Sequence, residues 1–156
     1  MPLVQQNLTH DLLGIFSSLN PNISQVAADV SQAYFDYATV ATGPSGTPLI
    51  IKGTESYLLR QQLYLIMSKL MPAPAAASLI VSAIQSFWLV PPMLTASGGA
   101  VTLITPIAMA AALGMIANVH GPIPVAARIM ATAMHTITSA VFVTEPILPF
   151  ISGFII

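Results

Sequence analysis

The feature that most constrains the fold is residues 72–92, PAPAAASLIVSAIQSFWLVPP, an uncharged segment with prolines at both ends. Proline is tolerated in the first turn of a helix, where its missing N–H has no intrahelical partner, and it ends a helix when it arrives later. The segment therefore predicts one helix of about five turns. Because nearly every side of it is apolar, this helix must be buried in protein or in lipid.

The scarcity of charge extends this conclusion to the whole chain. Only 6 % of its 156 residues are charged, whereas ordinary soluble domains carry roughly 25 %. Beyond Leu70 the charged residues are Arg128 and Glu145 alone. A chain with so little polar surface is expected to be covered by lipid or by other protein subunits. The remaining charges are Asp11, Asp29, Asp36, Lys52, Glu55, Arg60 and Lys69.

Several classes of function are disfavoured by the same composition. Nucleic-acid binding needs clustered Lys and Arg to neutralise phosphates, and this chain has four such residues and a net charge of −1. It contains no cysteine, which excludes disulfides and thiolate metal sites. The first residues, MPLVQQNLTHDLL, lack a basic region followed by an apolar one, so we expect no cleaved secretory signal.

Apolar periodicity and proline positions predict six helices. The helix expected at 23–41 places Val26, Val30, Tyr34 and Tyr37 on one stripe and polar residues off it, which indicates a face in water. Short extended segments are expected at 49–51, 101–105 and 140–144, and a turn at 96–99. The other expected helices cover 7–19, 54–71, 74–90, 106–118 and 125–140.

A threefold internal pattern relates these helices. The second helix of each pair begins near residue 22, 74 or 124, a period of about fifty. Leu13-Gly14 is echoed by Leu113-Gly114, and residues 26–30 by 125–129. We therefore predict a mainly α fold in which three αα-hairpin units form one compact helical domain over 1–156, with short β-segments at the connections. The approximate units are 7–53, 54–105 and 106–156. Small apolar hairpins that resemble one another by composition alone are the alternative.

No residue pattern indicates catalysis, cofactor binding or a metal site. His10, His120 and His135 do not have the spacing of zinc ligands, which come in pairs a turn apart with further ligands nearby. Asp29 and Asp36 lie seven residues apart on one helix face, as paired carboxylates for acid–base chemistry do. A solvated helix face explains them better, and we expect the protein not to be an enzyme.

Two groups of small residues indicate close helix packing. Ser78, Ser82 and Ser86 recur every fourth residue and line one side of the central helix, which suits a helix-contact seam. One side of the next helix carries only small side chains, those of Ala110, Gly114 and Ala117. For that second group we expect ordinary packing in the core.

Membrane insertion is a serious alternative to burial in protein. Residues 74–90, 100–119 and 124–143 are each apolar, and a spanning helix needs about twenty such residues. The prolines within these segments, however, shorten the helical runs. Neither a Lys/Arg cluster nor a flanking Trp/Tyr belt marks a membrane orientation. Burial among protein subunits explains the missing charges equally well.

A family resemblance adds to this interpretation. At SFWLVPP (86–92) and RIMATAMHTITSAVFVTEP (128–146) the sequence resembles the small Ala-, Pro- and Thr-rich virion structural proteins of tailed bacteriophages. The resemblance is one of general sequence character over most of the chain. The resemblance implies a non-enzymatic subunit of a tail, baseplate, neck or capsid. It also implies that the partners are other virion proteins and copies of the same chain.

The leading hypothesis is therefore a virion structural subunit that acts through apolar contacts. The expected strands 49–51, 101–105 and 141–144 would pack on or pair with neighbouring subunits, and the tail 150–156 would insert into a partner's groove. The alternative is a small polytopic integral membrane protein in a membrane complex. The candidate subunit contacts are Trp88, Phe87, Phe142, Phe150, Phe154, Ile155 and Ile156.

Overall fold

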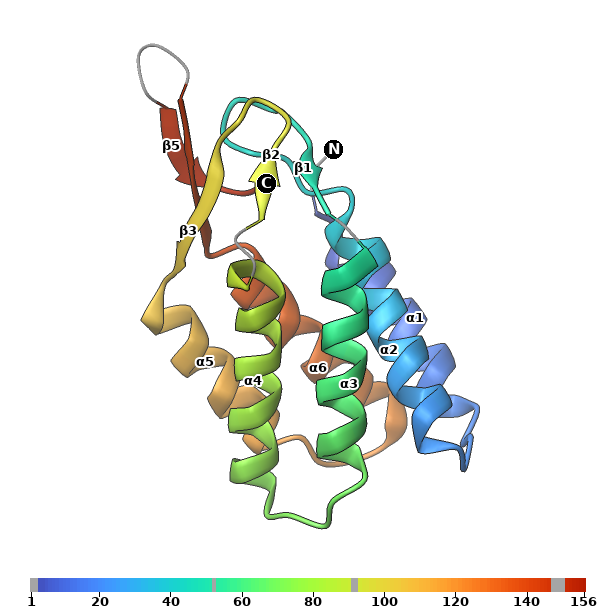
Figure 1. The fold of residues 1–156 in the computed structure, drawn as a ribbon. Coiled ribbons are helices and arrows are strands. Elements are labelled where there is room, and N and C mark those ends of the chain that lie inside the picture. The colour runs from blue at the N-terminus through green and yellow to red at the C-terminus, as the bar shows by residue number, and fades with distance from the viewer. Residues whose placement is uncertain (1–2, 52, 91–92, 147–150) are drawn as a thin grey trace.

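The structure, a computed structural model, describes residues 3–51, 53–90, 93–146 and 151–156. The described chain is mainly helical, as predicted. Its short β-segments also form a small antiparallel sheet, which was not predicted and which Figure 1 shows beyond one end of the helices. The helix positions agree with the expected ones to within a few residues. The six helices are α1 (Gln5–Ser17), α2 (Ile23–Ala38), α3 (Gly53–Met67), α4 (Ala73–Leu89), α5 (Pro106–Ala117) and α6 (Ile123–Thr138).

Local sequence explains where these helices begin. Asn22 caps α2, and its side-chain oxygen accepts a hydrogen bond from the backbone N–H of Gln25 at 3.3 Å. Proline occupies the first turn of α4, α5 and α6, where it removes no intrahelical hydrogen bond. Helix α4 ends at Leu89, as the proline pattern predicted; Pro91 and Pro92 themselves lie outside the described residues.

The helices pack side by side around a common centre. Helix α1 contacts α2 and α6, α3 contacts α2 and α4, and α5 contacts α4 and α6. Each helix therefore has a neighbour on both sides, and the described helices close into a ring (Figure 1). Within the described residues, none of these helices is both long and apolar enough to cross a membrane.

The sheet has five strands in the order of the sequence, all antiparallel. Its two ends are joined, because Thr42 bridges to Pro48 beside β1 and also exchanges two backbone hydrogen bonds with Ile156, just after β5. These bonds, of 2.9 and 3.1 Å, close the sheet on itself. The strands are β1 (Leu49–Ile50), β2 (Leu94–Thr95), β3 (Ala100–Ile104), β4 (Val141–Glu145) and β5 (Ile151–Phe154).

This closure corrects the expectation that the strands pair with neighbouring subunits and that the tail inserts into a partner's groove; packing of the sheet's outer face on a neighbour is a separate question. The strands pair with one another inside the chain, and β5, within the tail, pairs with β4 from Phe142↔Phe154 to Glu145↔Ile151. The physical reason is that an open edge leaves N–H and C=O groups unpaired, and closure satisfies them without a partner. The tail is thus a strand of the chain's own sheet rather than a free arm.

The centre of the molecule is an aromatic cluster that also contains a short chain of hydrogen bonds between buried polar groups. The indole Nε1 of Trp88 donates to the hydroxyl of Tyr34 at 2.8 Å, and that hydroxyl is 2.7 Å from the hydroxyl of Thr138. These bonds join α4, α2 and α6, and all three side chains are fully buried. Burial raises the pKa of Tyr34, so its hydroxyl stays neutral and bonded. Buried polar groups are thereby satisfied within the core.

Candidate functional site

The predicted contact residues fall into two groups. Trp88, Phe87 and Ile155 are buried in the core, and this burial leaves no side-chain surface for a neighbouring subunit in this structure. Phe142 is half-buried, while Phe154 and Ile156 are exposed. Phe150 lies outside the described residues. The apolar character of the first group therefore serves the chain's own core, because the central helix α4 packs against α3, α5 and the sheet.

The outer face of the closed sheet is largely apolar, and its exposed polar residues are Thr102, Thr144 and Ser152. Side chains alternate between the two faces of a strand, and an outward face in water is ordinarily polar. Here Val141 and Val143 are buried, whereas Phe142 between them forms an edge-to-face pair with Phe154 at 5.5 Å. The strands thus carry apolar residues on both faces, a pattern that favours coverage of the outer face. Its exposed apolar residues are Ile50, Leu94, Leu103, Phe154 and Ile156.

Helix α5 continues this apolar exterior. Its sequence, PIAMAAALGMIA, contains no polar side chain, yet Ile107 is 84 % exposed and Leu113 is also exposed. Ala110 and Gly114 are exposed as well, so the expectation that this side packs in the core is wrong for them, whereas Ala117 is half-buried and packs against the core. The apolar periodicity of the sequence could not show which side of α5 is buried, since every position of this helix is apolar.

We call this region the uncharged surface. It consists of exposed apolar residues of α5 and the outer face of the sheet. The exposed polar residues on the same strands are uncharged, namely Thr102, Thr144 and Ser152. Its apolar residues are Ile107, Leu113, Ile50, Leu94, Leu103, Phe154 and Ile156.

A shallow groove between α1 and α2 has the opposite character. Asp11, Asp29 and Asp36 line it together with His10. Two of the carboxylates accept hydrogen bonds of 2.7 Å from glutamine amides one turn earlier on the same helix. Asp36 is exposed and Asp29 half-buried, as the prediction of a solvated helix face requires. This acidic groove is lined by His10, Asp11, Gly14, Ile15, Asp29, Gln32, Ala33 and Asp36.

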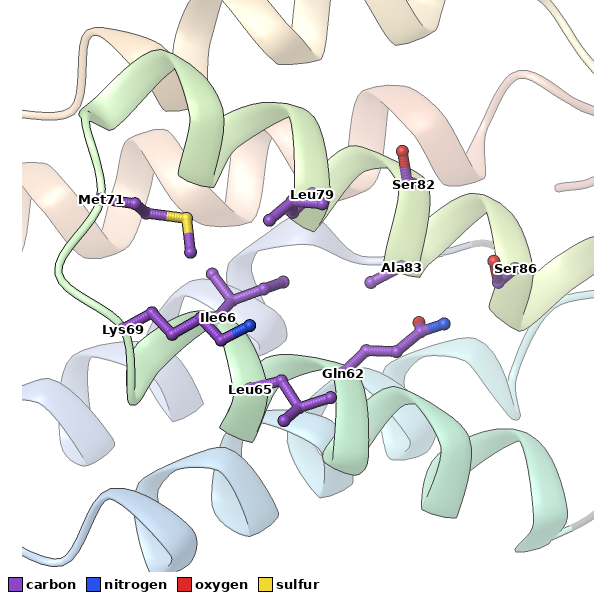
Figure 2. Close-up of a pocket in the computed structure, with 9 residues that line it drawn as sticks. All are labelled: Gln62, Leu65, Ile66, Lys69, Met71, Leu79, Ser82, Ala83 and Ser86. Atoms are coloured by element: carbon purple, nitrogen blue, oxygen red, sulfur yellow. The ribbon is translucent and has the colours of Figure 1, made fainter.

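A second groove, of about 260 Å³, lies between α3 and α4. Figure 2 shows Ile66 and Leu79 facing one another from the two helices, with Gln62 reaching toward Ser86. The Oε1 atom of Gln62 is buried without a hydrogen-bond partner among the described residues. The predicted serine seam is thus partly in this groove, since Ser82 and Ser86 line it. The described lining includes no His, Asp or Glu that would activate these serines.

The closed sheet holds a buried carboxylate at Glu145, which sequence reasoning missed. Its Oε1 accepts from the hydroxyl of Thr47 at 2.6 Å and its Oε2 from the backbone N–H of Ser45 at 3.2 Å. Burial by itself raises the pKa of Glu145, but hydrogen bonds from Ser45, Thr47 and Ser97 together lower it. The signal was present in the sequence, because Glu145 shares its strand face with buried Val141 and Val143.

Two glycines make room for this carboxylate. A Cβ atom at Gly43 would collide with Oε1 of Glu145, and one at Gly99 would lie 2.8 Å from its Cγ. The Gly99 N–H instead donates to the hydroxyl of Thr95 at 2.8 Å, which is itself 2.8 Å from the hydroxyl of Ser97. Because both carboxylate oxygens are occupied by the chain's own donors, the arrangement joins loops of the sheet rather than presenting a reactive acid.

The histidines do not assemble a metal site in the described part of the chain, where no group of three or more His, Asp or Glu side chains could hold a metal ion. The Nδ1 of His135 is hydrogen-bonded to the hydroxyl of Tyr37, and burial lowers the pKa of His135. Comparisons of the chain with protein-family models, with curated proteins and with solved structures gave no match.

Proposed function

We propose that this chain is a non-enzymatic structural subunit whose uncharged surface is covered by neighbouring subunits in a particle. The observation that carries the proposal is this surface itself, where large apolar side chains such as Ile107 and Phe154 lie exposed with no charge among them. Large exposed apolar areas mark interaction sites. The resemblance to tailed-phage virion proteins makes a virion the particle that we propose, with other virion proteins and copies of the chain as partners.

The energetic argument favours extensive coverage over a single contact. Fully burying one Leu, Ile or Phe side chain contributes about 1.5–3 kcal/mol. Association of two proteins costs about 4–15 kcal/mol in lost translational and rotational freedom. Several side chains from both α5 and the sheet must therefore be covered together. A subunit enclosed by neighbours meets this requirement better than one that touches a partner at a single helix.

We also infer that the chain is one domain built from three αα-hairpin units, approximately 7–53, 54–105 and 106–156. The support is a recurrence of burial at a spacing of fifty. Ala27, Ala77 and Ala127 are each fully buried in the second helix of a pair. The polar cluster in the sheet follows the same spacing, from Ser45 through Thr95 to Glu145. Further sets of buried residues so related are Tyr34/Ile84/Met134 and Tyr37/Phe87/Ile137.

The alternative is a subunit of a membrane complex, in which acyl chains cover the same uncharged surface. Fractionation of the native source without detergent distinguishes the two possibilities, with the chain followed by mass spectrometry. The proposal predicts that the chain sediments with intact particles and stays there after lipid is extracted. A chain that moves with membranes and leaves them only in detergent would contradict it.

A pair of variants tests the surface itself. Leu113→Glu places a charge on exposed α5, and Gln6→Glu places the same charge on exposed α1. We expect Leu113→Glu to reduce incorporation into particles strongly, because a charge buried at an apolar contact is costly. Gln6→Glu should be incorporated like the wild type. Equal incorporation of both variants would show that the α5 face is not covered.

A further inference from the structure

The groove between α3 and α4 contains a buried polar atom without a partner. The Oε1 atom of Gln62 is buried and accepts no hydrogen bond within the described chain. Figure 2 shows the Gln62 side chain reaching toward Ser86 in the groove. A buried acceptor that lacks a donor destabilises a folded chain. Such an atom needs an explanation, and a donor supplied from outside the chain is one.

The equivalent positions of the other two helix pairs are apolar, which sets Gln62 apart. Gln62 lies in the first helix of its pair, fifty residues after Leu12 in α1 and fifty before Ala112 in α5. Both of these residues are fully buried. The fold therefore accepts an apolar side chain at this position, and packing within the chain does not require an amide.

The rest of the groove suits an apolar occupant. Its described lining carries one charged residue, Lys69, which is exposed. A lysine can cover apolar surface with its stem while its ammonium group stays in water. The acidic groove lies at the equivalent place between α1 and α2, and it has Asp29 where this groove has Leu79, and Asp36 where this groove has Ser86. The α3–α4 groove thus lacks the carboxylates of its counterpart.

The size of the groove limits what it can hold. Its volume of about 260 Å³ is below the value of about 300 Å³ at which sites for drug-sized ligands begin. Ile66 and Leu79 face one another across it from the two helices (Figure 2). A small space between two apolar side chains fits a single alkyl chain better than a ring system.

We propose that the α3–α4 groove binds a single-chain amphiphile whose head group is a hydroxyl. The alkyl chain lies between Ile66 and Leu79, and the hydroxyl donates a hydrogen bond to Oε1 of Gln62. The last torsion of a glutamine side chain is soft, so a small rotation turns this oxygen toward the ligand. The site shares no residue with the uncharged surface, and it therefore extends beyond the proposed function.

Two isomeric probes test this hydrogen bond without any change to the chain. The probes n-octanol and heptyl methyl ether contain the same atoms and have similar lengths, but only the alcohol can donate. Each is titrated, below its solubility limit, into the full chain with isotope-labelled Leu and Ile methyl groups, and NMR chemical shifts report where it binds. The methyl groups of Leu65, Ile66 and Leu79 report on the groove, and those of Ile107 and Leu113 report on the uncharged surface.

We expect n-octanol to shift the groove methyl groups saturably and to bind at least about fivefold more tightly than the ether, because only the alcohol satisfies the Gln62 acceptor. Burial of apolar surface alone would favour the ether, since a buried hydroxyl without a partner is penalised. The absence of a saturable shift in the groove, shifts confined to α5, or equal affinities for the two probes would each overturn the proposal.

Two variants test the assignment further, and each introduces the residue found fifty positions earlier. Gln62→Leu matches Leu12, and Leu79→Asp matches Asp29. Gln62→Leu should fold and should lose the preference for the alcohol, with circular dichroism as the check on folding. Leu79→Asp should weaken the binding of both probes, because it places a charge beside the alkyl chain. A preference for n-octanol that persists in Gln62→Leu would contradict the proposal.

The outcome is separable from that of the proposed function. The described lining of the groove comes from α3, α4 and the turn between them, so Leu113→Glu on α5 should bind n-octanol as the wild type does. Weaker binding by Leu113→Glu would place the probe on the uncharged surface and overturn the proposal.

Discussion

Helices α2 and α4 bury equivalent positions but present different exteriors. Ala27 and Ala77 are fully buried, as are Tyr34 and Ile84. On the outside, α2 exposes Gln25, Gln32 and Asp36, whereas α4 exposes Ala75, Ser78 and Leu79. Both helices must bury one face, because each packs into the same ring of helices. The exterior is free to vary. Under the proposed function the difference reflects the surroundings of each helix, with water beside α2 and apolar neighbours beside the less polar exterior.

The largest expected effect is on the core that both regions share. Trp88 is fully buried and donates to Tyr34, so Trp88→Ala removes a large side chain and a hydrogen bond. We expect a loss of about 3–5 kcal/mol in the free energy of unfolding. Urea denaturation followed by circular dichroism measures it. Tyr64→Ala, on exposed α3, is the control and should cost far less; similar losses for the two would contradict the assignment of Trp88 to the core.

The next effect concerns the buried carboxylate in the sheet. Glu145→Gln keeps the size of the side chain, and its amide oxygen can accept from the Ser45 N–H while its amide nitrogen donates to the Thr47 hydroxyl. Both hydrogen bonds lose the charge assistance of the carboxylate, so we expect a loss of about 1–2 kcal/mol near neutral pH. Urea denaturation at pH 7 provides the value.

The pH dependence of this loss has a definite sign. The pKa of Glu145 is lowered in the folded chain, so its stabilisation is present above the pKa of the unfolded chain and is lost as pH falls through the folded value. The difference between wild type and Glu145→Gln should therefore shrink in acid. A difference that grows as the pH falls would show that the carboxylate is not stabilised by these hydrogen bonds.

A smaller effect comes from two glycines at echoed positions. Gly14 in α1 and Gly114 in α5 are exposed within helices, and an added Cβ would meet nothing within 4 Å at either. Ala is a better helix former than Gly by about 0.8–1 kcal/mol, so Gly14→Ala and Gly114→Ala should each stabilise the isolated chain by up to that amount. Thermal unfolding of the two variants gives the comparison. A gain in one helix and a loss in the other would indicate that the regions differ in more than their exteriors.

The smallest effect is on the stability of the isolated chain when its exterior changes. Leu113→Glu and Gln6→Glu both alter exposed side chains. We expect each to change the free energy of unfolding by no more than about 0.5 kcal/mol. Urea denaturation of the purified variants is the measurement. If Leu113→Glu destabilises the isolated chain strongly, its effect on incorporation reflects folding and not a lost contact.

The helices were predictable because prolines and apolar stripes mark them locally. Pro74 and Pro106 fix helix starts, and Val26, Val30, Tyr34 and Tyr37 fix a buried face. Strand β2 was missed because its two residues adjoin the turn predicted at 96–99, whereas β1 lies in the apolar run Leu49–Ile51. Strand β5 was missed because its segment reads only as an apolar tail. Closure of the sheet was missed for a different reason: strands with apolar residues on both faces look the same whether they pair within one chain or between two.

Neither the burial of Trp88 nor the exposure of α5 could be predicted from the sequence, and the reason is the same for both. Both lie in apolar helices, and composition alone cannot rank one apolar face above another. In the structure the large rings of Trp88, Phe87 and Tyr34 fill the centre. Helix α5 instead buries small Ala108 and Ala112 and exposes large Ile107 and Leu113, so residue size does not rank the faces either. Ala110 and Gly114, which are also small, lie at the surface. The uncharged surface therefore became visible only once the fold was known.

Residue-level footprinting tests the central claim most directly. The free chain and the native particle are each labelled with a carbene reagent, and peptides are compared by mass spectrometry. Leu19, 76 % exposed in the turn after α1, is the reference because it lies outside the uncharged surface. We expect Ile107, Leu113 and Phe154 to be labelled in the free chain and protected in the particle, while Leu19 is labelled in both. Equal labelling of α5 in the free chain and the particle would contradict it.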